Sequence, residues 1–77
     1  MSDFQQARID LGARLRRLRE ESRLTGKELA ARLNWQPSKV SRIENARQTP
    51  TGEDVAAWAR AVRAAPRLAD ELVAAAT

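Results

Sequence analysis

The sequence predicts an all-α domain, a compact bundle of about five helices with a helix-turn-helix at its centre. Apolar residues recur at intervals of three and four along most of the chain, whereas no segment alternates polar and apolar residues as a strand would. Helix-capping residues and prolines divide the 77 residues into five segments. A chain of this length forms one small domain.

The first predicted helix spans about residues 4–23. Its apolar residues recur at helical spacing, so we expect one face to pack inward; they are Phe4, Ala7, Leu11, Leu15 and Leu18. Several arginines between them widen the polar face. Such charges are usually solvated, or paired with an acid three or four residues away, such as Glu20 or Glu21.

The second predicted helix covers residues 25–33. It begins with Thr25 followed three residues later by Glu28, the pattern of a capping box. In this motif the hydroxyl and the carboxylate each accept a hydrogen bond from a backbone N–H that the helix leaves unpaired. The expected inward residues are Leu29, Ala30 and Leu33.

The third predicted helix, residues 37–45, follows after a turn that contains only Asn34 and Trp35 besides its cap. Gln36 stands at the cap position, and Pro37 at the first helical position, where its missing N–H costs nothing. Val40 and Ile43 form an apolar pair, which leaves the opposite side to Ser38, Lys39, Arg42 and Asn45. A short helix with such an outer face suits contact with base edges and phosphates.

Two further helices complete the predicted bundle. Residues 47–50 form a loop, because the residue before a proline disfavours helix. Thr51 then caps a fourth helix that ends at Ala64 and Ala65 and has as its apolar stripe Val55, Trp58 or Ala59, and Val62. The fifth helix begins at Pro66, with Leu68, Leu72 and Val73 inward, and residues 73–77 are expected to be frayed or to continue into a further region. Both tryptophans, Trp35 and Trp58, are expected to be packing residues.

The composition excludes several classes of protein. Without cysteine or histidine the chain lacks a disulfide framework, the usual zinc ligands and the usual general base at neutral pH. No nucleophile–base pair and no glycine-rich phosphate loop after a strand is present, so we expect no enzymatic activity, no cofactor and no metal. There is no signal-peptide pattern and no apolar stretch of membrane-spanning length, so we expect a cytoplasmic protein.

The positive charge lies mostly in the first two thirds of the chain. The net charge is +4, and residues 1–49 carry eleven Lys or Arg against six Asp or Glu, whereas residues 50–77 carry three against four. Such asymmetry favours a one-sided surface for a polyanion. A membrane surface or an acidic protein would be an equally suitable partner by charge alone.

Residues 12–62 resemble the Cro/cI-type (XRE) helix-turn-helix family, whose fold is that of the lambda-repressor-like DNA-binding domains. The matching segments are Gly12-x-x-Leu15-x-x-Leu18-Arg19-Glu20-Glu21, Leu24-Thr25-x-x-Glu28-Leu29-Ala30, Val40-Ser41-Arg42-Ile43-Glu44-Asn45 and Thr49-Pro50. The phrase WQPSKVSRIENARQTP is similar to the actinobacterial branch. Residues 25–33 would then be the positioning helix, and residues 37–45 the recognition helix in the major groove.

The resemblance also implies roles for individual residues. The base contacts would be made by Gln36, Ser38, Lys39 and Arg42. The phosphate contacts would be made by Thr25, Lys27, Asn45, Arg47, Gln48 and Thr49, and would set register rather than sequence preference. Ala30 matches a position where a small side chain lets the two helices approach closely. Arg19 and Glu44 match a family pair that forms a buried ion pair between the first and third helices.

Two positions depart from the family pattern. The family usually has a phosphate-binding glutamine after the threonine that starts the positioning helix, whereas this chain has Gly26; Lys27 next to it is a partial replacement. The family often ends the recognition helix with glycine, whereas this chain has Ala46. If that position needs a positive φ, alanine costs about 1 kcal/mol, or Asn45 takes the left-handed turn instead.

The resemblance implies a bacterial transcription regulator that binds double-stranded DNA at a near-palindromic operator. A homodimer would form through the fourth and fifth helices, where Trp58, Leu68 and Leu72 would meet a second copy. The chain is also expected to be the N-terminal part of a longer regulator. The alternative is a protein-interaction module, in which the same fold docks a partner regulator and the outer face of residues 37–45 has no need of Lys39 and Arg42.

Overall fold

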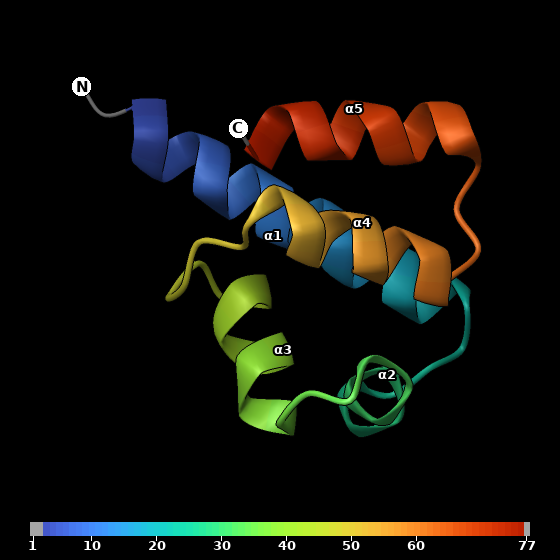
Figure 1. The fold of residues 1–77 in the computed structure, drawn as a ribbon. Helices are drawn as coiled ribbons and strands as arrows, with labels where there is room; N and C mark the ends of the chain where they lie inside the picture. Colours follow the sequence, from blue (N-terminus) through green and yellow to red (C-terminus); the bar gives the residue numbers. More distant parts are fainter. Residues whose placement is uncertain (1–2, 77) are drawn as a thin grey trace.

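The computed structural model describes residues 3–76, which contain five helices and no strand. Figure 1 shows the five helices in one bundle. They are α1 (Asp3–Glu21), α2 (Gly26–Leu33), α3 (Pro37–Glu44), α4 (Gly52–Ala61) and α5 (Pro66–Ala76). The predicted all-α fold is therefore confirmed.

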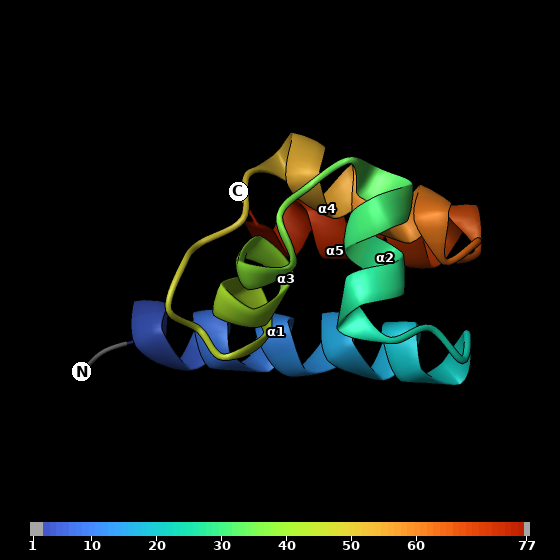
Figure 2. The ribbon, with the colours of Figure 1, turned by 90° about the horizontal axis from the view of Figure 1, so that it is seen from below.

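The helices form two groups. The antiparallel helices α4 and α5 pack on each other, and α1 packs on α5 (Figure 1). The short helices α2 and α3 pack on each other and close the bundle on a second side, where α3 contacts α1 and α2 contacts α4 (Figure 2). This arrangement leaves one long face of α3 without a covering helix.

All five helices contribute to a single apolar core. Its fully buried side chains include Leu15, Leu29, Ile43, Trp58 and Leu72. The indole Nε1 of Trp58 donates a hydrogen bond to the Leu15 carbonyl oxygen at 3.1 Å, so the polar atom of this large side chain is satisfied inside the core. Trp35 is half-buried and packs edge-on against Trp58, with 6.1 Å between the ring centroids. Both tryptophans are packing residues, as predicted.

The prediction that Phe4 and Ala7 face the core is wrong. Both side chains are exposed, and Phe4 retains 92% of its accessible surface. The first turns of α1 project beyond the helices that pack on it (Figure 1), so burial along the apolar stripe begins only at Leu11.

The proposed dimer contacts also need correction. Trp58 and Leu72 are 0% exposed within the single chain, and Leu68 is half-buried, so the first two cannot form a surface for a second copy. A stripe that packs inside a bundle has the same spacing as one that packs between subunits, and here the bundle core takes these residues.

Two predicted helix ends are shifted. The helix α4 stops at Ala61 rather than at Ala64 and Ala65, because Arg63 adopts a left-handed conformation. The helix α5 continues to Ala76, so fraying is wrong for residues 73–76, while residue 77 lies outside the described part.

Each of the first four helices ends in the same turn, in which a residue with positive φ reverses the chain. These residues are Arg23, Asn34, Ala46 and Arg63, with φ between 57° and 60°. After each of them, the next N–H bonds to a carbonyl five residues back, as Arg47 N does to Arg42 O at 2.8 Å. None of the three glycines, all within the described part, has a positive φ. Ala46, and not Asn45, therefore takes the left-handed turn after α3.

Replacing Ala46 with glycine is expected to raise the free energy of unfolding by about 1 kcal/mol, because glycine adopts a positive φ without steric cost. Chemical denaturation followed by circular dichroism measures this change. The matched control is Ala13→Gly at an exposed position in the middle of α1, where the same replacement should lower the free energy of unfolding by about 1 kcal/mol. If both replacements changed the free energy of unfolding in the same direction, the strain assigned to Ala46 would be contradicted.

Candidate nucleic-acid interface

The orientation of α3 is set by a close approach of its backbone to α1. A Cβ atom placed on Gly12 would lie 2.6 Å from the Ile43 carbonyl oxygen and 2.9 Å from that of Glu44. Real side chains do not tolerate such distances to backbone atoms. Glycine at position 12 therefore allows the last turn of α3 to rest directly on α1.

An ion pair joins the same two helices. Arg19 Nε donates to Glu44 Oε2 at 2.7 Å, and Arg19 Nη2 donates to Glu44 Oε1 at 3.0 Å. The two side chains are only 14% and 7% exposed. The bond to Glu44 raises the pKa of Arg19 above its ordinary value, although burial opposes this shift. The bidentate geometry confirms the pair that the family resemblance implies.

A third bond from Arg19 extends this clamp to the start of the helix-turn-helix. Arg19 Nη1 donates to the Leu24 carbonyl oxygen at 2.9 Å, next to the capping residue of α2. Thr25 Oγ1 accepts from Glu28 N at 3.0 Å, and the Glu28 carboxylate accepts from Thr25 N at 2.8 Å. These bonds lower the pKa of Glu28 and complete the predicted capping box.

Ser38 and Arg42 lie together on the exposed side of α3. Arg42 Nη1 donates to Ser38 Oγ at 3.2 Å, one helical turn away. Arg42 Nε donates to Gln48 Oε1 at 2.8 Å, in the loop after α3. Val40 and Ile43 are each 1% exposed on the opposite side, as the apolar pair predicts. Three of the ten predicted site residues therefore form one polar cluster on the uncovered face.

Lys39 points away from this cluster. Its Nζ lies 3.1 Å from Asp54 Oδ1 at the start of α4 and 4.0 Å above the ring centroid of Trp35. Burial raises the pKa of Asp54, but hydrogen bonds from Thr51 and Lys39 outweigh it, so the pKa lies below its ordinary value and the carboxylate is ionised at neutral pH. The structure thus gives Lys39 two partners within the domain and turns it towards α4.

The other predicted contacts surround α3 at its two ends. Gln36 caps the start of α3 without a side-chain hydrogen bond to the backbone, and its side chain is exposed. Asn45 Nδ2 donates back to the Ser41 carbonyl oxygen at 2.9 Å. Lys27, at the start of α2, and Arg47, in the loop after α3, are both exposed.

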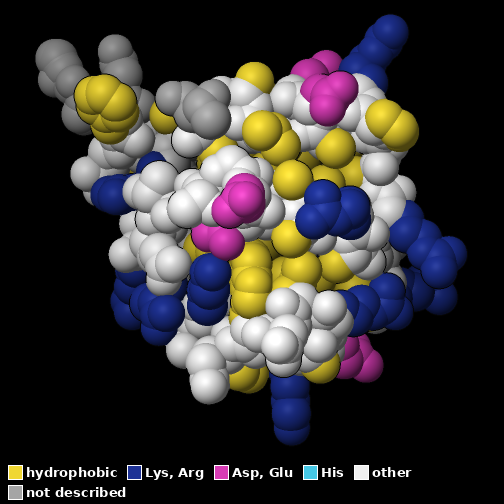
Figure 3. Space-filling model, viewed as in Figure 1, with side chains coloured by type: hydrophobic (Ala, Val, Ile, Leu, Met, Phe, Trp, Pro, Cys, Tyr) yellow, Lys and Arg dark blue, Asp and Glu magenta, His cyan; other side chains and the backbone are white. Residues whose placement is uncertain are grey.

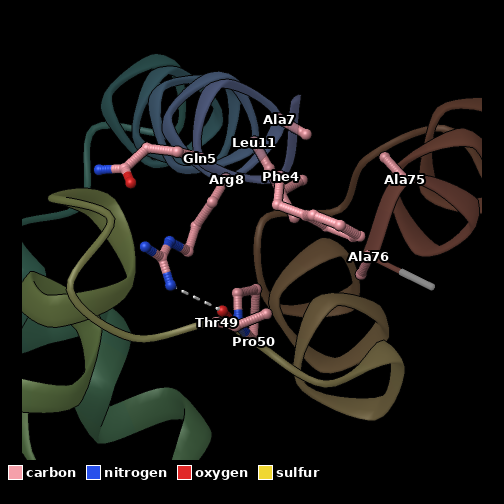
Figure 4. Close-up of a pocket in the computed structure, with 9 residues that line it drawn as sticks. All are labelled: Phe4, Gln5, Ala7, Arg8, Leu11, Thr49, Pro50, Ala75 and Ala76. Atoms are coloured by element: carbon pink, nitrogen blue, oxygen red, sulfur yellow. Dashed lines mark hydrogen bonds between the residues drawn. The ribbon is translucent and has the colours of Figure 1, made fainter. Parts of the chain in front are cut away.

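Arg8 is a residue at this interface that the sequence analysis missed. Its Nη1 donates to Thr49 Oγ1 at 3.3 Å, and its Nε is buried with no hydrogen-bond partner among the described residues. Figure 4 shows the side chain reaching from α1 to the loop between α3 and α4. Forty-one positions separate the two residues, so no local pattern connects them.

Basic side chains lie on this side of the domain, and two of them are paired with acids, Arg19 with Glu44 and Lys39 with Asp54. In the space-filling view, Lys and Arg side chains lie at the left edge, on the side of α3 and its following loop, and also along the right edge (Figure 3). Within residues 3–76 no group of three or more acidic, Cys or His residues is placed to hold a metal ion. None of the described helices is long and apolar enough to cross a membrane.

A family model described as a helix-turn-helix domain matches residues 10–72. The chain belongs to this helix-turn-helix family. No curated protein and no solved structure gave a significant match. Helix-turn-helix domains bind double-stranded DNA with their second helix in the major groove, so family membership indicates DNA binding and a regulatory role. In this chain the second helix of the motif is α3, whose outer face carries the Ser38–Arg42–Gln48 cluster.

Replacing Glu44 with alanine is expected to lower the free energy of unfolding by about 3–5 kcal/mol, because the largely buried Arg19 side chain, 14% exposed, is left without its carboxylate. Urea denaturation measures the loss. The control is Glu20→Ala, which breaks the exposed 3.2 Å pair with Arg16 and should cost less than about 1 kcal/mol. Losses of similar size in the two variants would show that the buried pair does not hold α3 on α1.

Proposed function

We propose that this helix-turn-helix domain is the sequence-specific DNA-binding domain of a Cro/cI-type transcription regulator of the actinobacterial branch. The observation that carries the proposal is the Ser38–Arg42–Gln48 cluster on the uncovered face of α3. A guanidinium held on the exposed face of a recognition helix, as that of Arg42 is in the last turn of α3, is the group that reads guanine most often in major grooves.

In the proposed complex, α3 lies in the major groove with its first residues closest to the bases. Gln36 and Ser38 then lie at the entry to the groove, and Arg42 donates to guanine O6 and N7. Lys39, which the resemblance implies as a base contact, is proposed instead to hold α3 against α4. Reading a base would require it to leave Asp54 and the Trp35 ring.

Phosphate contacts are proposed on both sides of α3. Lys27, with Thr25, lies at the start of α2, while Asn45, Arg47 and Thr49 follow the recognition helix. Arg8 adds a cation next to Thr49 and has N–H donors left over for a phosphate. At position 26 this chain has glycine where the family usually has a phosphate-binding glutamine, so Lys27 is proposed to bind that phosphate instead. A Cβ atom added at Gly26 would lie 3.8 Å from Val40 Cγ1, an ordinary contact distance.

We further propose that the regulator acts as a homodimer on a near-palindromic operator, with half-sites about one helical turn, or ~34 Å, apart. Since Trp58 and Leu72 are buried, residues other than these two would make the dimer contact.

Selection from random double-stranded DNA at near-physiological salt, followed by sequencing, tests the proposed function. Enrichment of an inverted repeat supports a dimeric, sequence-specific regulator. Enrichment of a single half-site supports base reading by a monomer and overturns dimerisation of this domain alone. No enrichment by folded protein would overturn the proposal and favour the protein-interaction module.

Replacing Arg42 with alanine is expected to weaken binding to the selected site by about 1–3 kcal/mol and to relax preference at one base position. Repeating the selection with the variant measures the preference, and a titration measures the affinity. The matched control is Lys39→Ala, which removes a charge from the same helix and should leave the base preference unchanged. An equal loss on all sequences for Arg42→Ala would make Arg42 a phosphate contact only.

Replacing Arg47 with alanine is expected to weaken binding to all sequences alike and to flatten the salt dependence of the binding constant by about one unit, because one fewer phosphate is neutralised. Titrations at several salt concentrations give this slope. Arg14→Ala is the control, since Arg14 is exposed on α1 beside Leu68 of α5, away from α3. An unchanged slope for Arg47→Ala would remove Arg47 from the phosphate contacts.

A further inference from the structure

We propose that Gln48 is a positioning residue that sets the base preference of Arg42, rather than a phosphate contact. The inference rests on the proposed function, because it concerns how the same face of α3 reads DNA. It starts from one observation: Gln48 bonds Arg42 through both its side chain and its backbone.

The turn after α3 places Gln48 against Arg42. Ala46 with its positive φ reverses the chain, after which Arg47 N and Gln48 N both donate to the Arg42 carbonyl oxygen, at 2.8 and 3.2 Å. The Gln48 side chain then runs back along α3, and its Oε1 accepts from Arg42 Nε at 2.8 Å. The backbone of the loop therefore fixes the position from which the Gln48 side chain reaches the Arg42 guanidinium.

Ser38 supplies a second restraint on the opposite part of the guanidinium. Its Oγ accepts from Arg42 Nη1 at 3.2 Å. An exposed arginine side chain is otherwise spread over many rotamers, and ordering it on binding costs free energy. Two hydrogen bonds in the free protein reduce that cost, because the side chain is already held in one conformation.

The restraints also select which edge of the guanidinium meets the DNA. Of the five N–H donors of Arg42, one on Nε and one on Nη1 are occupied, which leaves one on Nη1 and two on Nη2. The side edge formed by Nε and Nη2 is blocked by Gln48. A bidentate contact with guanine that keeps both bonds would use the remaining N–H groups of Nη1 and Nη2, so we expect Arg42 to approach the base end-on.

A phosphate contact would use Gln48 differently. A phosphate oxygen accepts hydrogen bonds, so only the Nε2 of Gln48 could serve it, and that contact would be independent of Arg42. Positioning instead uses Oε1 and acts only through Arg42. The two roles are separated by whether the effect of losing Gln48 depends on the presence of Arg42.

The experiment combines selection of random double-stranded DNA with titrations of the selected site, for the wild type, Gln48→Ala, Arg42→Ala and the double variant. We expect Gln48→Ala to reduce discrimination about 3- to 10-fold at the base position that Arg42→Ala relaxes, and at no other. In the Arg42→Ala background, Gln48→Ala should have no further effect. The control is Gln6→Ala on α1, where the glutamine side chain donates to Asp10 and no change is expected.

A conservative variant provides a rescue. Gln48→Glu keeps an oxygen acceptor for Arg42 Nε, so the base preference should be retained, while overall affinity falls for all sequences because a negative charge is added near the phosphates. If Gln48 had only a structural role in the loop, Gln48→Glu would not restore the preference at that one base position alone.

Several outcomes overturn the inference. If Gln48→Ala weakens all sequences equally, or if its effect adds to that of Arg42→Ala, Gln48 is a phosphate contact. If Gln48→Ala leaves the operator preference unchanged, only the positioning role fails and the proposed function stands. If the wild type enriches no sequence, the proposed function fails and the inference fails with it.

Discussion

The contact between α1 and α3 is the constraint on which the interface depends. Gly12 lets the two backbones touch, and the bidentate Arg19–Glu44 pair, shielded from water, fixes their relative orientation. A buried pair of this kind need not add net stability over apolar packing, but removing one partner strands a charge. The Arg19–Glu44 pair matters here because it holds α3, a helix of only eight residues, with one defined face outward.

The contact between α1 and α3 determines which residues lie on that outer face. With Val40 and Ile43 in the core, residues one turn apart on the other side, Ser38 and Arg42, stand on an uncovered surface. The left-handed turn at Ala46 then returns the loop to the same face, where Gln48 meets Arg42. Arg8 holds the loop from the α1 side through Thr49. The proposed reading surface is therefore built from α1, α3 and the loop, and not from α3 alone.

Local patterns predicted most of the fold. The capping box at Thr25, Pro37 at the first position of α3 and the pair Val40 and Ile43 each depend on neighbours within four residues, and the structure has them as predicted. The Arg19–Glu44 pair came from the family resemblance. Contacts between distant residues without such a pattern were missed: Lys39 turns to Asp54, fifteen residues on, and Arg8 reaches Thr49. Spacing also cannot separate a core stripe from a dimer stripe: Trp58 and Leu72 lie in the core, as their predicted packing requires, and not at the expected dimer contact.

We propose that the outer face of α3 and the loop after it contact DNA bases. Titrating a selected DNA site into ¹⁵N-labelled protein and following amide and Arg side-chain NMR signals tests this most directly. We expect the largest shifts at residues 36–49, with the Arg42 Nε signal among them, and small shifts along α5. Shifts centred on α5, or spread evenly over the domain, would contradict it.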